Sequence, residues 1–293
     1  MSDEAKKIVA EAFSCGAGDV KYSMELKNGM TNDSVVFTVD GEEGRFILRI
    51  PGAGTDVLIS RENEFAVYEK VLPLGICDDV VLLCKETGFK ITRYWEDARD
   101  CDKDCLEDLA ACMSLLRDFH GLGIAVQHEF CPFERIDYYE SLLGGRPSRY
   151  GDYYGTKSDV MKLRGYVESA GRDRTLSHID AVPSNFIMLP GGEIRLIDWE
   201  YAAMQDPHID VAMFAVYAMF SKPQIDALVD IYFLGKATGK QRKKIYAYVA
   251  ICGLLWSNWC EYKGLHGIEF GEYAKRQYGF AKEFCEVFAK CEG

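Results

Sequence analysis

The stretch HIDAVPSN at residues 178–185, followed by IRLIDWEYA at residues 194–202, decides how this chain is expected to fold. It contains Asp180, Asn185 and Asp198 in that order, with a β-type hairpin predicted between the last two around the turn sequence PGG. An Asp and an Asn five residues apart are common in loops, where their side chains bond to the local backbone. Because a strand, a turn, a second strand and an Asp follow, an ordinary turn is the weaker interpretation.

Three polar residues in this order are typical of kinase-type phosphotransferases, which position a hydroxyl group, neutralise phosphates and exclude water. Asp180 stands where the base is expected, able to orient an acceptor hydroxyl and take its proton. Asn185 and Asp198 offer oxygen ligands to Mg²⁺. His178 is expected to brace the loop. The predicted activity is therefore phosphoryl transfer, with ATP and Mg²⁺ as cofactors.

The first hundred residues are predicted to be rich in strands after one initial helix. A helix over residues 59–72 follows from apolar residues at helical spacing, and Pro73 ends it. Asp40 and Gly41 form a hairpin turn signal. Strands are expected at residues 20–26, 34–39, 45–50, 80–84 and 89–93. The predicted product is a five-stranded antiparallel sheet with one packed helix.

From about residue 103 the pattern becomes helical. Helices are predicted over residues 106–120 and 156–170, whereas residues 131–155 mix aromatic residues with Gly and Pro and favour no regular structure throughout. The boundary is expected near residues 95–102. This gives an N-terminal nucleotide-binding lobe at 1–98 and a helical C-terminal lobe at 99–293 that carries the catalytic loop and the substrate site.

The N-terminal lobe also contains the residues expected to bind the nucleotide. Arg49 ends the third strand, where a kinase places its phosphate-binding cation, and Glu64 on the following helix can pair with it. The loop between the first two strands can direct backbone amides at phosphates, through Asn28, Gly29, Thr31 and Asn32. The segment ITRYWED at 91–97 is the predicted adenine hinge, with contacts from Ile91, Arg93 and Tyr94.

The composition limits the partners of the chain. Its 34 Lys+Arg and 46 Asp+Glu give a formal net charge of −12, which argues against nucleic acid and favours a cationic small molecule, although acidity also serves solubility alone. Eleven cysteines without paired spacing suit free thiols rather than a disulfide framework. The charged start has no apolar signal core, and the apolar run at 211–220 is too short to span a bilayer. A cytoplasmic protein without membrane insertion is expected.

With these pieces assembled, the chain resembles the bacterial lic-type choline kinases, within the choline/ethanolamine kinase and aminoglycoside phosphotransferase superfamily. The matching pieces are GMTN at 29–32, ISRENEFAVYE at 59–69, CPFERIDYY at 131–139, HIDAVPSN, IDWEYA at 197–202 and LLWSNWCEYKG at 254–264. The resemblance implies an α+β, bilobal protein-kinase-like fold and transfer of the ATP γ-phosphate to the hydroxyl of choline. It also implies that Asp180 is the base, and that Asn185 and Asp198 hold magnesium.

A choline site needs aromatic faces and nearby carboxylates, because a quaternary ammonium cannot donate hydrogen bonds. Trp256 and Trp259 share a helix face, and Tyr201 follows Asp198 by three residues. An aromatic stripe is more often core packing, but the resemblance favours a choline wall. Other tyrosines, Tyr262, Tyr273 and Tyr278, are left open.

One position departs from the eukaryotic relatives, in which a Glu after the IDFEY segment faces the cation. The corresponding position here lies near Tyr217, which is therefore included in the predicted choline site. Glu200 and Glu261 are the acidic residues considered as substitutes.

Two other functions remain open from the sequence. One is a kinase for another amine or amino alcohol, such as ethanolamine, thiamine or an aminoglycoside, whose primary ammonium would need hydrogen-bond acceptors. The other is a choline-binding pseudokinase, which would have no need of Asp180, Asn185 and Asp198 together. The oligomeric state is not determined by the sequence.

Overall fold

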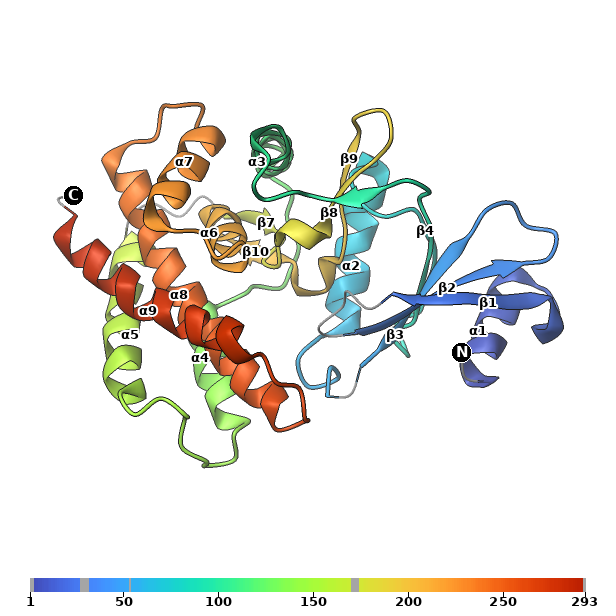
Figure 1. Ribbon diagram of the computed structural model, residues 1–293, viewed down its shortest axis with the longest axis horizontal. Coiled ribbons are helices and arrows are strands. Elements are labelled where there is room, and N and C mark those ends of the chain that lie inside the picture. The colour runs from blue at the N-terminus through green and yellow to red at the C-terminus, as the bar shows by residue number, and fades with distance from the viewer. Residues whose placement is uncertain (1–2, 27–31, 53, 170–173, 292–293) are drawn as a thin grey trace. The chain divides into compact units, whose positions relative to one another are not determined.

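The chain folds into two compact units, shown in a computed structural model that describes residues 3–26, 32–52, 54–169 and 174–291 (Figure 1). The first unit comprises residues 1–99 and 187–200, and the second comprises residues 100–186 and 201–293. The expected lobes at 1–98 and 99–293 stay a prediction. They differ from these compact units mainly in the hairpin segment 187–200, which groups with the first unit.

The first unit is built on the predicted five-stranded antiparallel sheet, in the order β1-β2-β3-β5-β4. Its strands are β1 (Val20–Leu26), β2 (Asn32–Val39), β3 (Phe46–Pro51), β4 (Val80–Leu83) and β5 (Lys90–Arg93). In the register of β3 and β5, Leu48 lies opposite Ile91 and Arg49 lies opposite Lys90. Because successive side chains alternate between faces, Arg49 and Ile91 are on opposite faces of the sheet.

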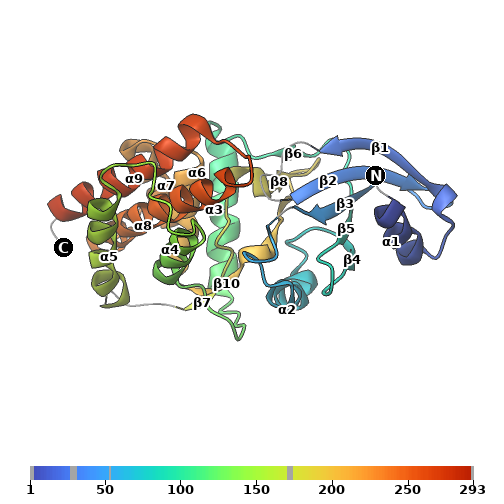
Figure 2. The same ribbon diagram turned by 90° about the horizontal axis from the view of Figure 1, so that it is seen from below.

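Two helices accompany this sheet, not the single packed helix predicted. Helix α1 (Asp3–Phe13) buries Ala5 and Val9 in one apolar cluster with residues of β1, β2, β3 and β5. Helix α2 (Arg61–Val71) begins after Ser60, whose Oγ accepts a hydrogen bond from the Asn63 amide, and continues into η2 (Leu72–Leu74). A short η1 (Ala17–Asp19) precedes β1. The two α-helices lie at separate parts of the sheet in both views (Figures 1 and 2).

Helices make up most of the second unit. They are α3 (Leu106–Gly121), α4 (Pro132–Ser141), α5 (Tyr153–Ser169), α6 (His208–Tyr217), α7 (Lys222–Tyr232), α8 (Gly239–Gly264) and α9 (Gly271–Lys290). Helix α8 is buried along most of its length and packs against α4, α5, α6 and α9 (Figure 2). Helix α4 was not predicted, although Pro132 at its first turn is a helix-start signal and Phe133, Ile136 and Tyr139 form a buried face.

Short elements connect the functional segments. Strands β7 (Thr175–Ser177) and β10 (Ala203–Gln205), which were not predicted, pair antiparallel. The hairpin of β8 (Phe186–Met188) and β9 (Ile194–Leu196) confirms the strand pair expected after the HIDAVPSN stretch. The remaining short elements are β6 (Arg99–Asp100), η3 (Pro183–Asn185) and η4 (Trp199–Tyr201).

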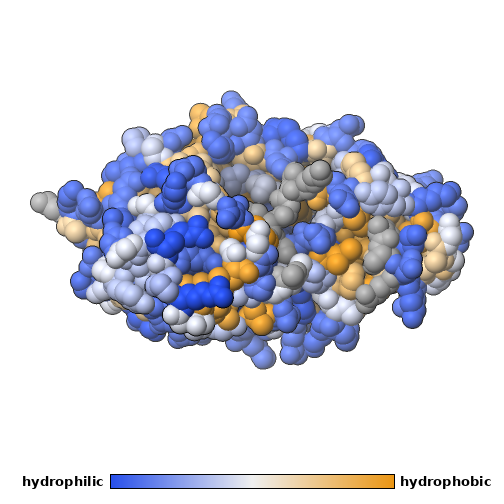
Figure 3. Space-filling view, turned by 60° about the horizontal axis from the view of Figure 1, so that its bottom comes forward, coloured by the Kyte–Doolittle hydropathy of each residue, from blue (hydrophilic) through white to orange (hydrophobic). Residues whose placement is uncertain are grey.

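One face of the surface is mainly hydrophilic (Figure 3). Hydrophilic residues cover most of the face shown in Figure 3, and hydrophobic residues form smaller patches between them. Within the described residues, no helix combines the length and the apolar composition that crossing a membrane requires. All eleven cysteines are free thiols, as the spacing predicted.

Gly253 allows α9 to pack directly on α8. A Cβ at this position would lie 2.7 Å from the Gln277 carbonyl oxygen, 2.8 Å from Phe280 Cβ and 2.9 Å from the Ala281 amide nitrogen. Since two of these atoms belong to the backbone, α9 would have to move. We expect Gly253→Ala to lower the free energy of unfolding by about 2–3 kcal/mol in denaturant titrations, although Ala favours helix by about 1 kcal/mol.

A second glycine provides the control for this prediction. Gly165 lies inside α5, and a Cβ there would meet nothing within 4 Å. Gly165→Ala should therefore stabilise the chain by about 0.5–1 kcal/mol. If Gly253→Ala is also stabilising, the close approach of α8 and α9 is not what requires glycine.

Candidate active site

The loop that carries Asp180 begins with a strained backbone. Ile179 has φ +68°, a left-handed conformation that is unusual for a β-branched residue. Its side chain and that of His178 are fully buried. Both backbone amides donate to one carboxylate: His178 N–H to Asp210 Oδ2 and Ile179 N–H to Asp210 Oδ1, each at 2.7 Å. The strained segment is thus anchored directly before Asp180.

Asp210, which sequence reasoning missed, is itself fixed by a buried network. Its Oδ2 lies 2.9 Å from His120 Nε2, and His120 Nδ1 lies 2.9 Å from the Tyr232 hydroxyl. Asp210 is fully buried in the first turn of α6. A charged residue inside the apolar run HIDVAMFAVY is the signal that could have identified it, because a buried carboxylate needs partners.

The predicted pair Asp180 and Asn185 is brought together by η3. Asn185 Nδ2 donates to the Asp180 carbonyl oxygen at 2.9 Å and lies 3.3 Å from Asp180 Oδ2. Pro183 starts this turn of 3₁₀ helix. Because the Nδ2 group of Asn185 is engaged as a donor, its Oδ1 is the atom left to bind a cation.

The predicted aromatic residues form one cluster within the second unit. Trp256 lies at its centre, with edge-to-face contacts to Tyr201 (5.8 Å between ring centroids), Tyr217 (5.3 Å) and Trp259 (5.6 Å). The cluster continues through Phe270 to Tyr273, which returns to Tyr217 at 5.8 Å. We call these six rings the aromatic cluster.

The charge of Asp180 acts on this cluster. Burial and, more weakly, the neighbouring Tyr273 and Asp180 raise the pKa of Tyr217 well above its ordinary value. Burial likewise raises the pKa of Tyr273, with a further contribution from Asp180. Both phenols therefore stay neutral hydrogen-bonding groups near a carboxylate.

The two acidic residues considered as substitutes do not belong to the aromatic cluster. Glu261 Oε1 accepts hydrogen bonds from Ser148 Oγ at 2.7 Å and from the Arg149 amide at 3.2 Å. Glu200 belongs to the first unit, where it pairs with arginines. The suggestion that either carboxylate replaces the missing Glu stays a prediction.

The three tyrosines whose role the sequence left open make different contacts. Tyr273 belongs to the aromatic cluster, as described above. Tyr262 packs against His266, and Tyr278 stacks on Tyr150. Trp259 Nε1 is a buried donor for which the described residues provide no acceptor.

In the first unit, Arg49 and Glu64 pair as predicted, and Asp198 lies beside them, which was not predicted. Arg49 Nη1 and Nη2 donate to the two Glu64 carboxylate oxygens at 2.5 and 3.0 Å, and Arg49 Nη1 lies 3.5 Å from Asp198 Oδ1. Burial by itself would lower the pKa of Arg49, but Glu64, Glu200 and Asp198 outweigh it and raise that pKa. Burial would raise the pKa of Glu64, but Arg49 holds it below its ordinary value. Both groups therefore remain charged.

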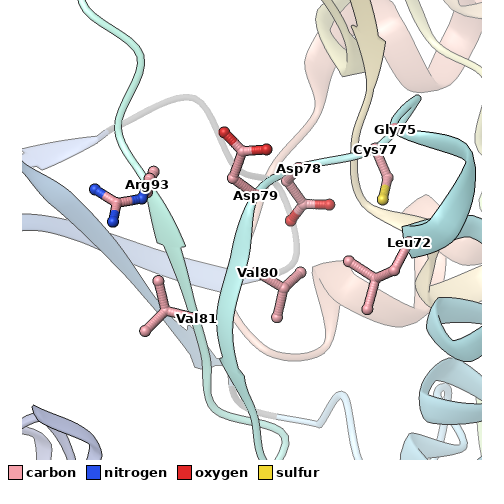
Figure 4. Close-up of a pocket in the computed structure, with 8 residues that line it drawn as sticks. All are labelled: Leu72, Gly75, Cys77, Asp78, Asp79, Val80, Val81 and Arg93. Carbon is pink, nitrogen blue, oxygen red and sulfur yellow. The ribbon is translucent and has the colours of Figure 1, made fainter.

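The predicted hinge residues lie on β5 and directly after it. Ile91 is fully buried on the face opposite Arg49. The Arg45 guanidinium carbon lies 4.3 Å from the centroid of the Tyr94 ring, and the Tyr94 backbone amide donates a hydrogen bond to the Arg45 carbonyl oxygen. Arg93 lines a surface pocket together with Leu72, Gly75, Cys77, Asp78, Asp79, Val80 and Val81 (Figure 4). The pocket shares no lining residue with the group around Arg49. Adenine contacts by Ile91, Arg93 and Tyr94 stay a prediction.

The predicted glycine-containing loop is described only at its end. Asn28, Gly29 and Thr31 lie outside the described residues. Asn32 starts β2, and its Nδ2 lies 3.2 Å from both carboxylate oxygens of Glu200. Among the described residues, no group of three or more His, Cys, Asp and Glu side chains is arranged to hold a metal ion. The oxygens of Asn185 and Asp198 suit the hard cation Mg²⁺, and their role as its ligands stays a prediction.

Comparison with known proteins places this chain among the phosphotransferases. The profile of the family described as "Phosphotransferase enzyme family" matches residues 24–246. The chain is 29% identical over 276 residues to Protein LicA of Haemophilus influenzae, covering 88% of this chain and 78% of that protein.

Solved structures show the same fold. The structure of choline kinase LicA from Streptococcus pneumoniae matches with a TM-score of 0.82 and 28% identity, covering 97% of this chain and 100% of that one. A structure of LicA in complex with AMP matches with the same TM-score and identity, covering 98% and 100%. The predicted α+β, kinase-like fold is confirmed.

Proposed function

Since the chain belongs to the phosphotransferase enzyme family, as a kinase of the choline kinase and aminoglycoside phosphotransferase type, we propose that it phosphorylates the hydroxyl of choline with Mg-ATP. The observation that carries the choice of choline is the aromatic cluster. A quaternary ammonium binds through ring faces and cannot satisfy hydrogen-bond acceptors. The cluster offers six rings, and the charge of Asp180 reaches two of them.

The nucleotide half of the proposal rests on the cations of the first unit. Arg49 Nε is a buried donor for which the described residues supply no acceptor, a pattern that suits an oxygen of a phosphate. A LicA structure that contains AMP supports a nucleotide ligand. We assign Arg49, held by Glu64, to the phosphates. The loop residues Asn28, Gly29, Thr31 and Asn32 and the hinge residues Ile91, Arg93 and Tyr94 are the further proposed nucleotide contacts.

Asp180 is the proposed base. Its side chain is partly exposed, while the residue before it is held by Asp210. It would orient the acceptor hydroxyl and take its proton as the hydroxyl oxygen bonds to the γ-phosphorus of ATP, while the bond from that phosphorus to the bridging oxygen breaks and ADP leaves. Asn185 and Asp198 each provide an oxygen to the magnesium ion, and bound Mg-ATP supplies the transferable phosphoryl group. Tyr201, Tyr217, Trp256 and Trp259 hold the trimethylammonium group.

A panel of acceptors tests the proposed function. ADP release would be measured with Mg-ATP and choline, ethanolamine, thiamine, kanamycin or 3,3-dimethylbutan-1-ol, a neutral isostere of choline. We expect the highest kcat/KM with choline. The isostere should be about 5- to 30-fold poorer, because ring faces attract a cation by about 1–2 kcal/mol more than a neutral group. Turnover of kanamycin without turnover of choline would overturn the proposal.

Trp256 allows the substrate site to be tested separately. Trp256→Leu fills much of the volume but removes the central ring, so we expect the KM for choline to rise about tenfold or more. The KM for ATP should stay within about twofold. Trp256→Phe keeps an aromatic face, so its KM for choline should rise less than that of Trp256→Leu. Equal increases in both KM values would indicate that Trp256 serves only core packing.

A further inference from the structure

Arg61, at the start of α2, is a second guanidinium beside Arg49. Its Nη1 donates to Glu64 Oε2 at 2.7 Å and to Glu200 Oε2 at 2.9 Å. Glu64 Oε2 also accepts from Arg49 Nη2 at 3.0 Å, so one carboxylate oxygen joins the two arginines. Only 13% of the Arg61 side chain is exposed, compared with 6% for Arg49. The Arg49–Glu64 pair is therefore part of a larger buried network.

Gly88, in the turn between β4 and β5, holds both arginines in place. Its carbonyl oxygen accepts from Arg49 Nη2 at 2.9 Å. A Cβ on Gly88 would lie 2.5 Å from Arg61 Nε and 2.9 Å from Arg61 Cδ, and the backbone has φ +73°. Glycine thus lets the turn lie directly on the Arg61 side chain while its carbonyl orients Arg49.

Arg61 reduces the excess of carboxylates over cations around Arg49. The group contains two cations, Arg49 and Arg61, and three carboxylates, Glu64, Asp198 and Glu200. Glu200 lies 3.5 Å from Arg49 Nη1, and so does Asp198. Without Arg61, one arginine would face three carboxylates. Glu200 would then compete with Glu64 for Arg49.

We propose that Arg61 is a positioning residue for nucleotide binding: it neutralises Glu64 and Glu200 from one side, so that Arg49 keeps the orientation needed for phosphates. This inference rests on the proposed nucleotide-dependent function. It assigns Arg61 no contact with the reacting groups. Asn32, at the start of β2, joins the same network, because its Nδ2 donates to Glu200.

Nucleotide affinity of the full chain tests the inference. The dissociation constant of AMP-PNP with Mg²⁺ would be measured calorimetrically for the wild type and for Arg61→Met, Arg61→Lys and the double variant Arg61→Met/Glu200→Gln. Arg61→Met should weaken binding about tenfold, since it leaves Glu200 uncompensated. The double variant should recover at least threefold of that loss, because it removes the uncompensated charge. Arg61→Lys should be intermediate, since an ammonium lacks the planar fork.

Steady-state kinetics separate positioning from general damage. Arg61→Met should raise the KM for ATP about as much as the dissociation constant, while the KM for choline stays within about twofold. Affinity within about twofold of the wild type would overturn the inference alone. If Arg61→Met weakens AMP-PNP binding and the double variant recovers none of that affinity, the uncompensated charge of Glu200 is not the cause, and the inference is overturned. A wild-type chain that binds no Mg-nucleotide would instead overturn the proposed function.

A glycine pair tests the same inference without changing a charge, in case Arg61→Met does not fold. Gly88→Ala adds a methyl group against Arg61, whereas Gly75→Ala places Ala at a similar φ of +64° with nothing within 4 Å. Both variants carry the strain of a left-handed residue. Gly88→Ala should weaken AMP-PNP binding at least fivefold relative to Gly75→Ala. Equal affinities would contradict the proposed role.

Discussion

Asp180→Asn should lower kcat about 10³-fold or more while nucleotide affinity stays within about twofold. The amide cannot accept the proton of the acceptor hydroxyl, although it keeps the size and hydrogen-bonding shape of the carboxylate. Asn185 Nδ2 would still have the backbone carbonyl of residue 180 as its acceptor. The measurement is ADP release at saturating choline and ATP, together with calorimetric binding of AMP-PNP.

The control is Asp118→Asn on the surface of α3, where 73% of the Asp118 side chain is exposed. This change should leave kcat unaltered. Turnover by Asp180→Asn at the wild-type rate would remove Asp180 from the base role. A large fall in nucleotide affinity instead would indicate that Asp180 acts mainly on binding.

Asp210→Ala should be the most destabilising substitution considered for this chain, lowering the free energy of unfolding by about 3–5 kcal/mol. It leaves the amides of His178 and Ile179 and the ring of His120 without their acceptor in a buried site. Ile179 would then relax from its left-handed conformation, and Asp180 would move with it. The free energy of unfolding, measured in denaturant titrations, and kcat should therefore both decrease.

Asp210→Asn distinguishes the anchor from simple burial. One amide oxygen can still accept from Ile179 or His178, but the amide NH₂ cannot accept from the other. We expect a loss of stability smaller than that of Asp210→Ala and a kcat about tenfold or more below the wild type, because Asp180 is no longer held. Normal kcat in a folded Asp210→Ala variant would contradict the anchoring role.

Much of the first unit was predictable because its elements are local in sequence. The β-type composition of β1, β2 and β3 and the Asp40-Gly41 turn depend on neighbouring residues, and the strands appear within a few residues of their predicted bounds. Helix α1 was predicted, but its packing on the sheet was not. A hydrophobic pattern shows that a face is buried, and it does not say against which partner.

The short strands β7 and β10 illustrate the opposite case. Each has only three residues, too few to show a period, and they pair across more than twenty residues of chain. Helix α4 was missed because Gly, Pro and aromatic residues around it obscured its apolar spacing. Its buried face became evident only from packing against α8.

By itself, the sequence determined the reaction class and the hairpins between strands that are neighbours along the chain. It also determined that Asp180 and Asn185 lie close together, since the two residues are five apart in one loop. Only the tertiary structure decided that Asp210 anchors this loop and that Glu261 accepts a hydrogen bond from Ser148. It also decided that the six rings of the aromatic cluster meet. The physical reason is that burial forces polar groups to find partners, and those partners are chosen by how distant segments pack. The same holds for Arg61 and Gly88, whose contacts with Arg49 and Glu200 no spacing in the sequence reveals.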